Sequence, residues 1–290
     1  EGPLAEQAVH RVAAGFGQVQ PTKGIRDDHG LIARFRQAQF MGGRLPEFLG
    51  VGVQKGGTTT LQRLLEQHPG AFLPAAKELH YFSLHYALGE GWYREQFAEA
   101  GAQQRCGEIT PYYLFHPAAP ARIQALLPQA RLIVLLRDPV ERALSQYFHS
   151  LRLGLEPLEL EPALAAEAQR LAGAEAALAA ADGRHRSHQE HSYLARSRYE
   201  QQLQRLEALF AAKQLLVLRS EDLFAQPERV WEQVLTFLEL EALPLPPLAQ
   251  PANAGQGEAA KVPEKLRQAL REQLQPTYGW VESRYGITWP

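Results

Sequence analysis

The sequence predicts a single α/β domain in which helices flank a doubly wound parallel sheet. Short apolar runs alternate with segments of helical periodicity, which is typical of strands buried on both faces of a parallel sheet. Two of these runs end in glycine or charged residues, as is common where ligands bind at the carboxyl ends of parallel strands. With 290 residues, 45% hydrophobic and 21% charged, the chain is long enough for one large core.

From residue 46 onward the expected elements alternate regularly. They are strand Phe48–Val53, helix Thr58–Gln67, a short helix near Trp92–Phe97, strand Arg105–Glu108, helix Pro120–Leu127, strand Leu132–Leu136, helix Val140–Leu151, strand Gln214–Arg219, helix Pro227–Leu238 and a terminal helix, Pro263–Gln275. Strands that alternate with helices in this way pair in parallel, and their crossover helices cover both faces of the sheet.

The first strand runs through a glycine turn into a helix, in the order Phe48-Leu-Gly-Val-Gly-Val-Gln-Lys-Gly-Gly-Thr-Thr-Thr-Leu61. The glycine pair allows a tight turn, and the threonines stand where the first amides of a helix lack backbone partners. These amides, the helix dipole and a lysine ammonium favour a phosphate. The turn is therefore P-loop-like, and the residues expected to bind phosphate are Lys55, Gly56, Gly57, Thr58, Thr59 and Thr60.

The position of the lysine distinguishes this turn from a Walker A loop. That motif reads Gly-x4-Gly-Lys-Ser/Thr, with the lysine directly after the second glycine. Gly52 and Gly57 have the Walker spacing, but residue 58 is threonine and Lys55 precedes the glycine pair. A kinase-like phosphotransferase that uses ATP is therefore the less favoured alternative. A nucleotide-binding module without catalytic activity is a second alternative.

The order Lys-Gly-Gly-Thr-Thr-Thr-Leu after this strand resembles the 5′-phosphosulfate loop of the sulfotransferases that use 3′-phosphoadenosine 5′-phosphosulfate (PAPS). The likeness is greatest to their heparan-sulfate-type and bacterial carbohydrate branch. It implies PAPS as donor, 3′-phosphoadenosine 5′-phosphate (PAP) as product and no metal. It also implies a hydroxyl or amine acceptor on a carbohydrate or another small molecule.

A second block follows the strand Leu132–Leu136. Arg137 stands at the strand end, and Pro139 suits the first position of the next helix. Ser145 lies two turns into that helix, so Arg137 and Ser145 can converge on one phosphate. The block resembles the family's 3′-phosphate site. Alternatively, Arg137 pairs with a carboxylate at the helix start, either Asp138 or Glu141.

A third block, Lys77-Glu-Leu-His-Tyr-Phe-Ser83, resembles the family's Lys-Glu-x-His-Phe-Phe segment. In an extended chain, Glu78 and His80 point to the same side and can face one hydroxyl. We expect Glu78 to act as general base, His80 to orient the acceptor or sulfonate, and Lys55 to stabilise the departing phosphate oxygen. Alternatively, a solvated turn precedes a strand that carries a core histidine and buried aromatic residues.

Two looser likenesses follow. Glu108-Ile-Thr-Pro resembles a Glu-x-Thr-Pro segment in which heparan-type enzymes often have lysine at position 109, so an anionic acceptor would lose a basic contact here. Glu108 is either a second site carboxylate or a strand-end charge. Ser197 stands where relatives have glycine before a helix, and Tyr199 either approaches the nucleotide or packs in the core. The contacts of the loop 251–261 are unassigned, although Lys261 could substitute for a basic residue that relatives have there.

Residues 156–192 interrupt the alternation. An Ala, Glu and Leu-rich run, Glu161–Ala181, predicts a helix that ends at Asp182-Gly183, followed by a polar loop that borders the acceptor. Three histidines recur there at every third residue, which suits metal ligation, but the flanking arginines disfavour a cation. We therefore favour a solvated or acceptor-facing basic loop, with these histidines at His185, His188 and His191.

Charge and cysteine content limit the binding partners and the cellular location that can be expected. The net charge of 30 − 32 = −2 gives no overall field for nucleic acid, and no stretch approaches the roughly 18 to 20 apolar residues of a membrane span. Residues 1–45 lack both periodicity and the apolar core of a signal peptide, so we expect an N-terminal extension before a domain of residues 46–290. The single cysteine, Cys106, excludes an intrachain disulfide, which favours a cytoplasmic location. We expect Cys106 to be a small buried residue.

Overall fold

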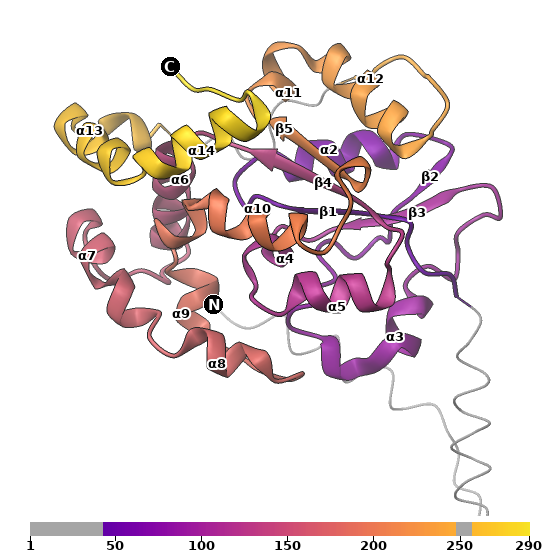
Figure 1. The fold of residues 1–290 in the computed structure, drawn as a ribbon, viewed down its shortest axis with the longest axis horizontal. Helices are drawn as coiled ribbons and strands as arrows, with labels where there is room; N and C mark the ends of the chain where they lie inside the picture. Colours follow the sequence, from indigo (N-terminus) through magenta and orange to yellow (C-terminus); the bar gives the residue numbers. More distant parts are fainter. Residues whose placement is uncertain (1–42, 248–256) are drawn as a thin grey trace, which may run out of the picture. The chain divides into compact units, whose positions relative to one another are not determined.

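The computed structural model describes residues 43–247 and 257–290. Their centre is a five-stranded sheet in the order β2-β3-β1-β4-β5, and every neighbouring pair is parallel (Figure 1). The strands are β1 Phe48–Gly52, β2 Ala71–Phe72, β3 Arg105–Ile109, β4 Arg131–Leu136 and β5 Leu215–Arg219. Sequence analysis missed β2, because a two-residue strand is too short to show a pattern. The expected extension, residues 1–45, lies almost entirely outside the described residues.

The helices follow the predicted alternation. They are α2 Thr58–Glu66, α3 Gly89–Glu95, α4 Tyr112–Phe115, α5 Ala119–Leu126, α6 Pro139–Arg152, α7 Leu160–Arg170, α8 Ala174–Ala179, α9 Arg186–Glu190, α10 Tyr199–Glu207, α11 Asp222–Ala225, α12 Pro227–Leu238, α13 Glu264–Gln273 and α14 Gln275–Tyr285. The predicted bounds of α12 are those observed, and the predictions that correspond to α2, α3, α5, α6 and α13 differ by one to three residues at an end.

The strand order confirms a doubly wound sheet. The chain passes from β1 to one side, where it forms β2 and β3, and then crosses to form β4 and β5 on the other side. The two strands next to β1 are therefore β3 and β4, and the direction in which the chain adds strands to the sheet reverses between them. In such sheets the ligand crevice lies outside the carboxyl ends of the strands where the order reverses.

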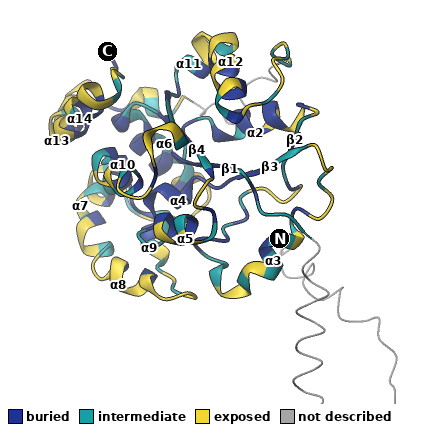
Figure 2. Cartoon of the chain, turned by 45° about the vertical axis from the view of Figure 1, so that its right-hand side comes forward, coloured by how far each residue is buried: buried dark blue, intermediate teal, exposed yellow. Residues whose placement is uncertain are grey.

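Buried side chains alternate between the two faces of the sheet. On β4, Ile133 and Leu135 pack in a cluster with residues of α2, α11 and α12, whereas Leu132 and Val134 pack with residues of α5, α6 and α10. Figure 1 shows these two groups of helices on opposite sides of the sheet. In Figure 2 the strands and the inward helix faces are buried, and exposed residues gather on the outer helix faces. Strands buried on both faces explain the continuous apolar runs of the sequence.

Close packing fixes the position of β3 against β1. A Cβ atom added to Gly107 would lie 2.2 Å from the ring of Phe48, so no larger residue fits there without movement. The neighbouring Cys106 is fully buried, and burial raises the pKa of its thiol to about 11. The prediction of a small buried cysteine is therefore confirmed.

The structure corrects the prediction for residues 156–192. The single expected helix is two helices, α7 and α8, separated at Gly173, which has φ 76° and precedes α8. The expected polar loop contains a further helix, α9, and two of its histidines, His188 and His191, are buried. Composition indicated the helical content but not the left-handed glycine that breaks the run.

Candidate functional site

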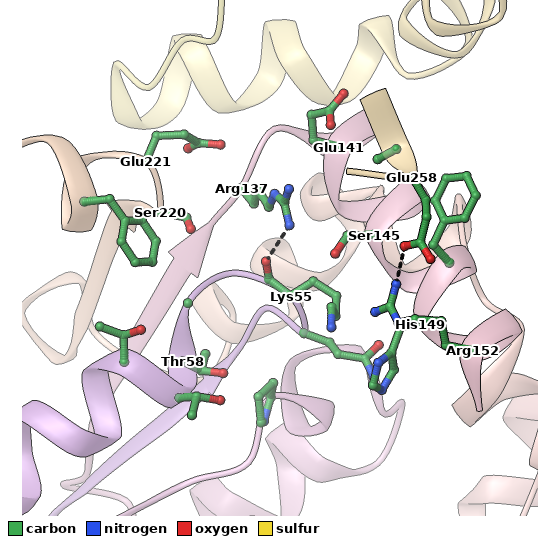
Figure 3. Close-up of a pocket in the computed structure, with 18 of the residues that line it drawn as sticks. Lys55, Thr58, Arg137, Glu141, Ser145, His149, Arg152, Ser220, Glu221 and Glu258 are labelled. Atoms are coloured by element: carbon green, nitrogen blue, oxygen red, sulfur yellow. Dashed lines mark hydrogen bonds and ion pairs between the residues drawn. The ribbon is translucent and has the colours of Figure 1, made fainter. Parts of the chain in front are cut away.

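A cavity of about 680 Å³ is lined by residues from the carboxyl ends of β1, β4 and β5 (Figure 3). Its walls come from the loop after β1, residues 77–78, one face of α6, the segment after β5 and residues 257–259. This is the position that the strand order indicates for a ligand.

The loop after β1 brings the start of α2 to the cavity. Gly57 precedes the helix with φ 86°, a left-handed conformation that favours glycine. No side chain caps α2, and its first turn has no acidic residue, so its first amides are available to an anion. Thr58, Thr59 and Thr60 all line the cavity, and Thr59 Oγ1 accepts a hydrogen bond from Lys77 Nζ at 2.6 Å.

Lys55 lies in the middle of a cluster of positive charge. Burial, followed by the charges of Arg152 and Arg137, lowers the pKa of its ammonium to about 8. The Arg137 guanidinium also donates to the Lys55 carbonyl oxygen at 3.2 Å, which ties the end of β4 to the loop (Figure 3). Cations held this close together favour the binding of an anion between them.

Arg137 and Ser145, which the second sequence block expects to converge on one phosphate, both line the cavity. The alternative partners of Arg137 have other contacts: Asp138 accepts from the Glu141 amide at 2.9 Å and caps α6, and Glu141 pairs with Arg267. The Arg137 guanidinium therefore contacts the loop after β1 and faces the cavity.

Glu78 and His80 meet, but not in the way predicted. They do not lie on an extended strand, because both have left-handed backbones, with φ 55° and 53°. His80 Nε2 lies 3.5 Å from Glu78 Oε2. Glu78 lines the cavity, whereas His80 is not among its lining residues and contacts Ser83 Oγ through Nδ1 at 3.2 Å.

The Glu78 carboxyl is ionised at neutral pH. Burial alone would raise its pKa, but the hydrogen bond and charge of His80, together with the charge of Lys77, bring the pKa below the ordinary glutamate value. As the alternative interpretation of this segment predicts, Tyr81 and Phe82 are buried in the core, although they are not on a strand.

Glu108 supports this segment from within the core. Its carboxylate is buried and accepts hydrogen bonds from Tyr93, Tyr113 and Thr110 at 2.7 to 2.8 Å. Burial raises its pKa despite these bonds. Thr110 Oγ1 also accepts from the His80 amide at 3.4 Å, so Glu108 contacts the segment through Thr110. Glu108 lies one residue before the end of β3 with its carboxyl buried, and it does not line the cavity.

The prediction for position 109 is wrong. Ile109 is 2% exposed and packs in the core cluster beneath α2, where its side chain faces Gly50. It does not line the cavity. The isoleucine therefore gives no information about the charge of an acceptor.

Ser197 and Tyr199 are buried behind the cavity. Ser197 Oγ accepts from Arg142 Nε at 2.6 Å and donates to the Pro139 carbonyl at 2.7 Å. The Tyr199 hydroxyl donates to the Arg137 carbonyl at 2.9 Å, and its ring packs in the core. Tyr199 thus holds the main chain at Arg137, as its core interpretation predicts, and does not itself line the cavity.

Sequence analysis missed several lining residues on α6 and in the later loop. His149 and Arg152 follow Ser145 by one and two helical turns, and Arg152 NH1 pairs with Glu258 Oε2 at 2.6 Å. The i, i+4, i+7 spacing from Ser145 is a signal that could have identified the two α6 residues. No motif indicated Glu258. Of the loop 251–261, residues 251–256 lie outside the described part, and Lys261 is not a lining residue.

The three histidines around α9 have separate partners. His188 Nδ1 hydrogen-bonds with the Tyr112 hydroxyl at 2.8 Å, His185 Nδ1 accepts from the His188 amide, and His191 Nε2 contacts the Leu155 carbonyl. Within residues 43–247 and 257–290, no group of three or more His, Cys, Asp or Glu side chains is arranged to hold a metal. No helix in these same ranges is long and apolar enough to cross a membrane.

Comparison with known proteins adds independent information. A family model described as "Sulfotransferase domain" matches residues 45–253. The chain is 43% identical over 111 residues to the membrane-associated sulfotransferase kil1 of Dictyostelium discoideum, covering 37% of this chain and 24% of that protein. It is 41% identical over 108 residues to the mouse (Mus musculus) heparan sulfate glucosamine 3-O-sulfotransferase 3B1, covering 37% and 27%. The matches thus span about a quarter of the length of these curated relatives.

A solved structure is similar over most of the domain. The crystal structure of a sulfotransferase from Alicyclobacillus acidocaldarius has a TM-score of 0.71 and 26% sequence identity, covering 85% of this chain and 98% of that one. The fold of most of this chain is therefore similar to that of a solved sulfotransferase.

Proposed function

The chain belongs to the sulfotransferase domain family, and we propose that it transfers a sulfuryl group from PAPS to an acceptor hydroxyl or amine. One observation carries this proposal: the uncapped start of α2, Lys55 and Arg137 line the same cavity as the Glu78 carboxylate. Anion-binding groups and a proton acceptor are thereby brought to one site.

The described residues fit a nucleotide that carries phosphates at the 3′ and 5′ positions of its ribose. The start of α2, with Lys55, Gly56, Gly57 and the three threonines, would hold the 5′-phosphosulfate. Arg137 and Ser145 would hold the 3′-phosphate, the guanidinium through a charge-assisted contact. Tyr199 and Ser197 support this second subsite by holding the main chain at Arg137 and Pro139.

The proposed chemistry is an in-line transfer. PAPS supplies the sulfuryl group. Glu78 accepts the proton of the acceptor hydroxyl while the acceptor oxygen forms its bond to sulfur and the bond from sulfur to the phosphate oxygen breaks. Lys55 stabilises the negative charge that develops on this phosphate oxygen. His80 positions the Glu78 carboxylate and does not itself contact the acceptor. This role differs from the acceptor-orienting role expected from the sequence.

Lys55, Arg137 and the α2 amides supply the positive potential that phosphotransferases take from magnesium. We therefore propose a reaction that needs no metal. Its acceptor would be a carbohydrate or another small molecule, since the mouse relative is named for a glucosamine in heparan sulfate. We propose residues 46–290 as the sulfotransferase domain, with residues 156–192 beside the acceptor.

A transfer assay with two labelled donors tests the proposal. The protein is incubated with a panel of sugars and alcohols and either sulfur-labelled PAPS or ATP labelled at its γ-phosphate with magnesium. We expect label to enter a product only from PAPS. Label from ATP alone would favour the phosphotransferase, and no transfer by a protein that binds PAP would favour the inactive nucleotide-binding module.

A further inference from the structure

The peptide group between Arg137 and Asp138 is held on both of its sides. It lies just beyond the end of β4, which is Leu136. Its carbonyl oxygen accepts from the Tyr199 hydroxyl at 2.9 Å, and its N–H donates to Glu221 Oε1 at 3.0 Å. Because a peptide group is planar, these two hydrogen bonds together restrict the direction in which the Arg137 side chain leaves the main chain.

Glu221 connects this peptide group to the segment after α14, residues 286–290. Glu221 and Arg137 both line the cavity (Figure 3). The second oxygen of Glu221, Oε2, accepts from the Trp289 indole nitrogen at 2.9 Å. The Trp289 ring is buried and packs edge-on against Tyr278, with 5.9 Å between the ring centroids. The indole N–H therefore helps to fix the carboxylate that holds the Asp138 amide.

A second contact, from within α14, holds the side chain of Asp138. The Tyr278 hydroxyl donates to Asp138 Oδ2 at 2.9 Å, while Oδ1 accepts from the Glu141 amide and caps α6. Tyr278 is also buried. Asp138 is thus held through its main chain by Glu221 and through its side chain by Tyr278.

The segment that carries Trp289 is itself anchored to its neighbours. Arg219, at the end of β5, donates to the Thr288 carbonyl oxygen at 3.0 Å. Arg271, on α13, donates to the Trp289 carbonyl oxygen at 2.6 Å. The hydrogen bond to Glu221 therefore comes from a segment that is held at two further points.

We propose that Glu221, Tyr278 and Trp289 are positioning residues of the donor site, which hold Arg137 where its guanidinium meets the 3′-phosphate. The inference rests on the proposed function, because it takes Arg137 as the residue that binds this phosphate. Tyr278 and Trp289 do not line the cavity, so they act only through Asp138 and Glu221. Since a hydrogen bond weakens steeply with poor geometry, a displaced guanidinium loses affinity for phosphate although it keeps its charge.

Calorimetric titration of two variants of the full chain with PAP tests this inference. Trp289→Phe and Tyr278→Phe each remove one hydrogen-bond donor, keep an aromatic ring and leave the net charge unchanged. We expect each to weaken PAP binding by about three- to tenfold, which is the effect typical of one hydrogen bond. Binding of adenosine 5′-phosphosulfate, which lacks the 3′-phosphate, should change by less than about twofold.

Two matched variants separate positioning from general destabilisation. Trp231→Phe removes another buried indole donor, which bonds to the Leu243 carbonyl oxygen at 3.0 Å. Tyr285→Phe removes another hydroxyl of α14, which donates to Glu207 at 2.7 Å. Neither residue lines the cavity, so both variants should bind PAP like the unmodified protein. Urea unfolding checks that all four variants are folded.

The results that would overturn the inference differ from those that would contradict the proposed donor. Unchanged PAP binding by Trp289→Phe and Tyr278→Phe, or equal losses for PAP and adenosine 5′-phosphosulfate, would overturn the inference. Failure of the unmodified protein to bind PAP would contradict the proposed donor. Amide hydrogen exchange then decides the inference: a peptide spanning residues 137–141 should exchange faster in these two variants than in the matched ones, and equal exchange would overturn it.

Discussion

His80 Nε2 lies 3.5 Å from Glu78 Oε2, in a segment where both residues have a left-handed backbone. Such a conformation is unfavourable for residues other than glycine, and it persists only where surrounding contacts enforce it. Here the His80 amide donates to Thr110, whose hydroxyl donates to the buried Glu108. The ionised Glu78 carboxylate thus lines the cavity, and the His80 imidazole contacts it from outside the cavity lining.

Replacing the carboxylate should abolish most of the activity without disturbing donor binding. General-base catalysis contributes about 10²–10⁴-fold, so Glu78→Gln should lower kcat by that order and change PAP affinity by less than about twofold. Steady-state kinetics and PAP titration measure the two quantities. Glu99→Gln, an exposed change outside the cavity, is the control. Full turnover by Glu78→Gln would remove Glu78 from this role.

The protonation of Lys55 should set an alkaline limit on donor use. Since its pKa is about 8 in the free protein, the positive charge is present below this pH and is lost as pH rises through it. We expect kcat/KM for PAPS to fall above about pH 8. Because arginine stays charged, kcat/KM of the Lys55→Arg variant should no longer fall above this pH, even if its rate is lower. The Lys77→Arg variant should still show the alkaline fall in kcat/KM. If kcat/KM of the Lys55→Arg variant still falls above this pH, the alkaline fall belongs to the titration of another group.

The proposed 3′-phosphate subsite can be tested by changing the protein and the ligand together. Arg137→Ala should weaken PAP binding by about 2 kcal/mol or more through loss of a charge-assisted contact. Because Arg137 also holds the Lys55 carbonyl, general damage to the loop must be separated from loss of the phosphate contact. Adenosine 5′-phosphosulfate lacks the 3′-phosphate, so its affinity should change little. Equal losses for both nucleotides would show that Arg137 acts only on the loop.

Two glycine substitutions should have opposite effects on stability. Gly107→Ala places a Cβ atom 2.2 Å from the Phe48 ring and should lower the free energy of unfolding by roughly 1–3 kcal/mol. Gly279→Ala lies within α14, and its Cβ meets no atom within 4 Å, so it should raise the free energy by roughly 0.5–1 kcal/mol. Urea unfolding measures both. Similar midpoints for the two variants would contradict the packing of β3 against β1.

The sheet and the glycine turn into α2 could be predicted from the sequence because their signals are local. Apolar runs such as Leu132–Leu136 reflect burial on both faces of the sheet, and the Gly56-Gly57 pair marks the turn into α2. The left-handed backbone at Glu78 and His80 could not be predicted, because this segment is held by contacts with distant residues, such as the hydrogen bond from the His80 amide to Thr110. The same applies to Glu258, whose partner Arg152 is 106 positions away.

Calorimetric titration with PAP, compared with ADP and with ATP plus magnesium at one salt concentration, tests the central claim most directly. Arg137 and Ser145 both line the cavity, and we propose that they bind a 3′-phosphate, so the cavity should prefer a nucleotide that carries one. We predict micromolar binding of PAP and much weaker binding of the other two nucleotides. Preference for ATP with magnesium would contradict the account and assign the cavity to phosphoryl transfer.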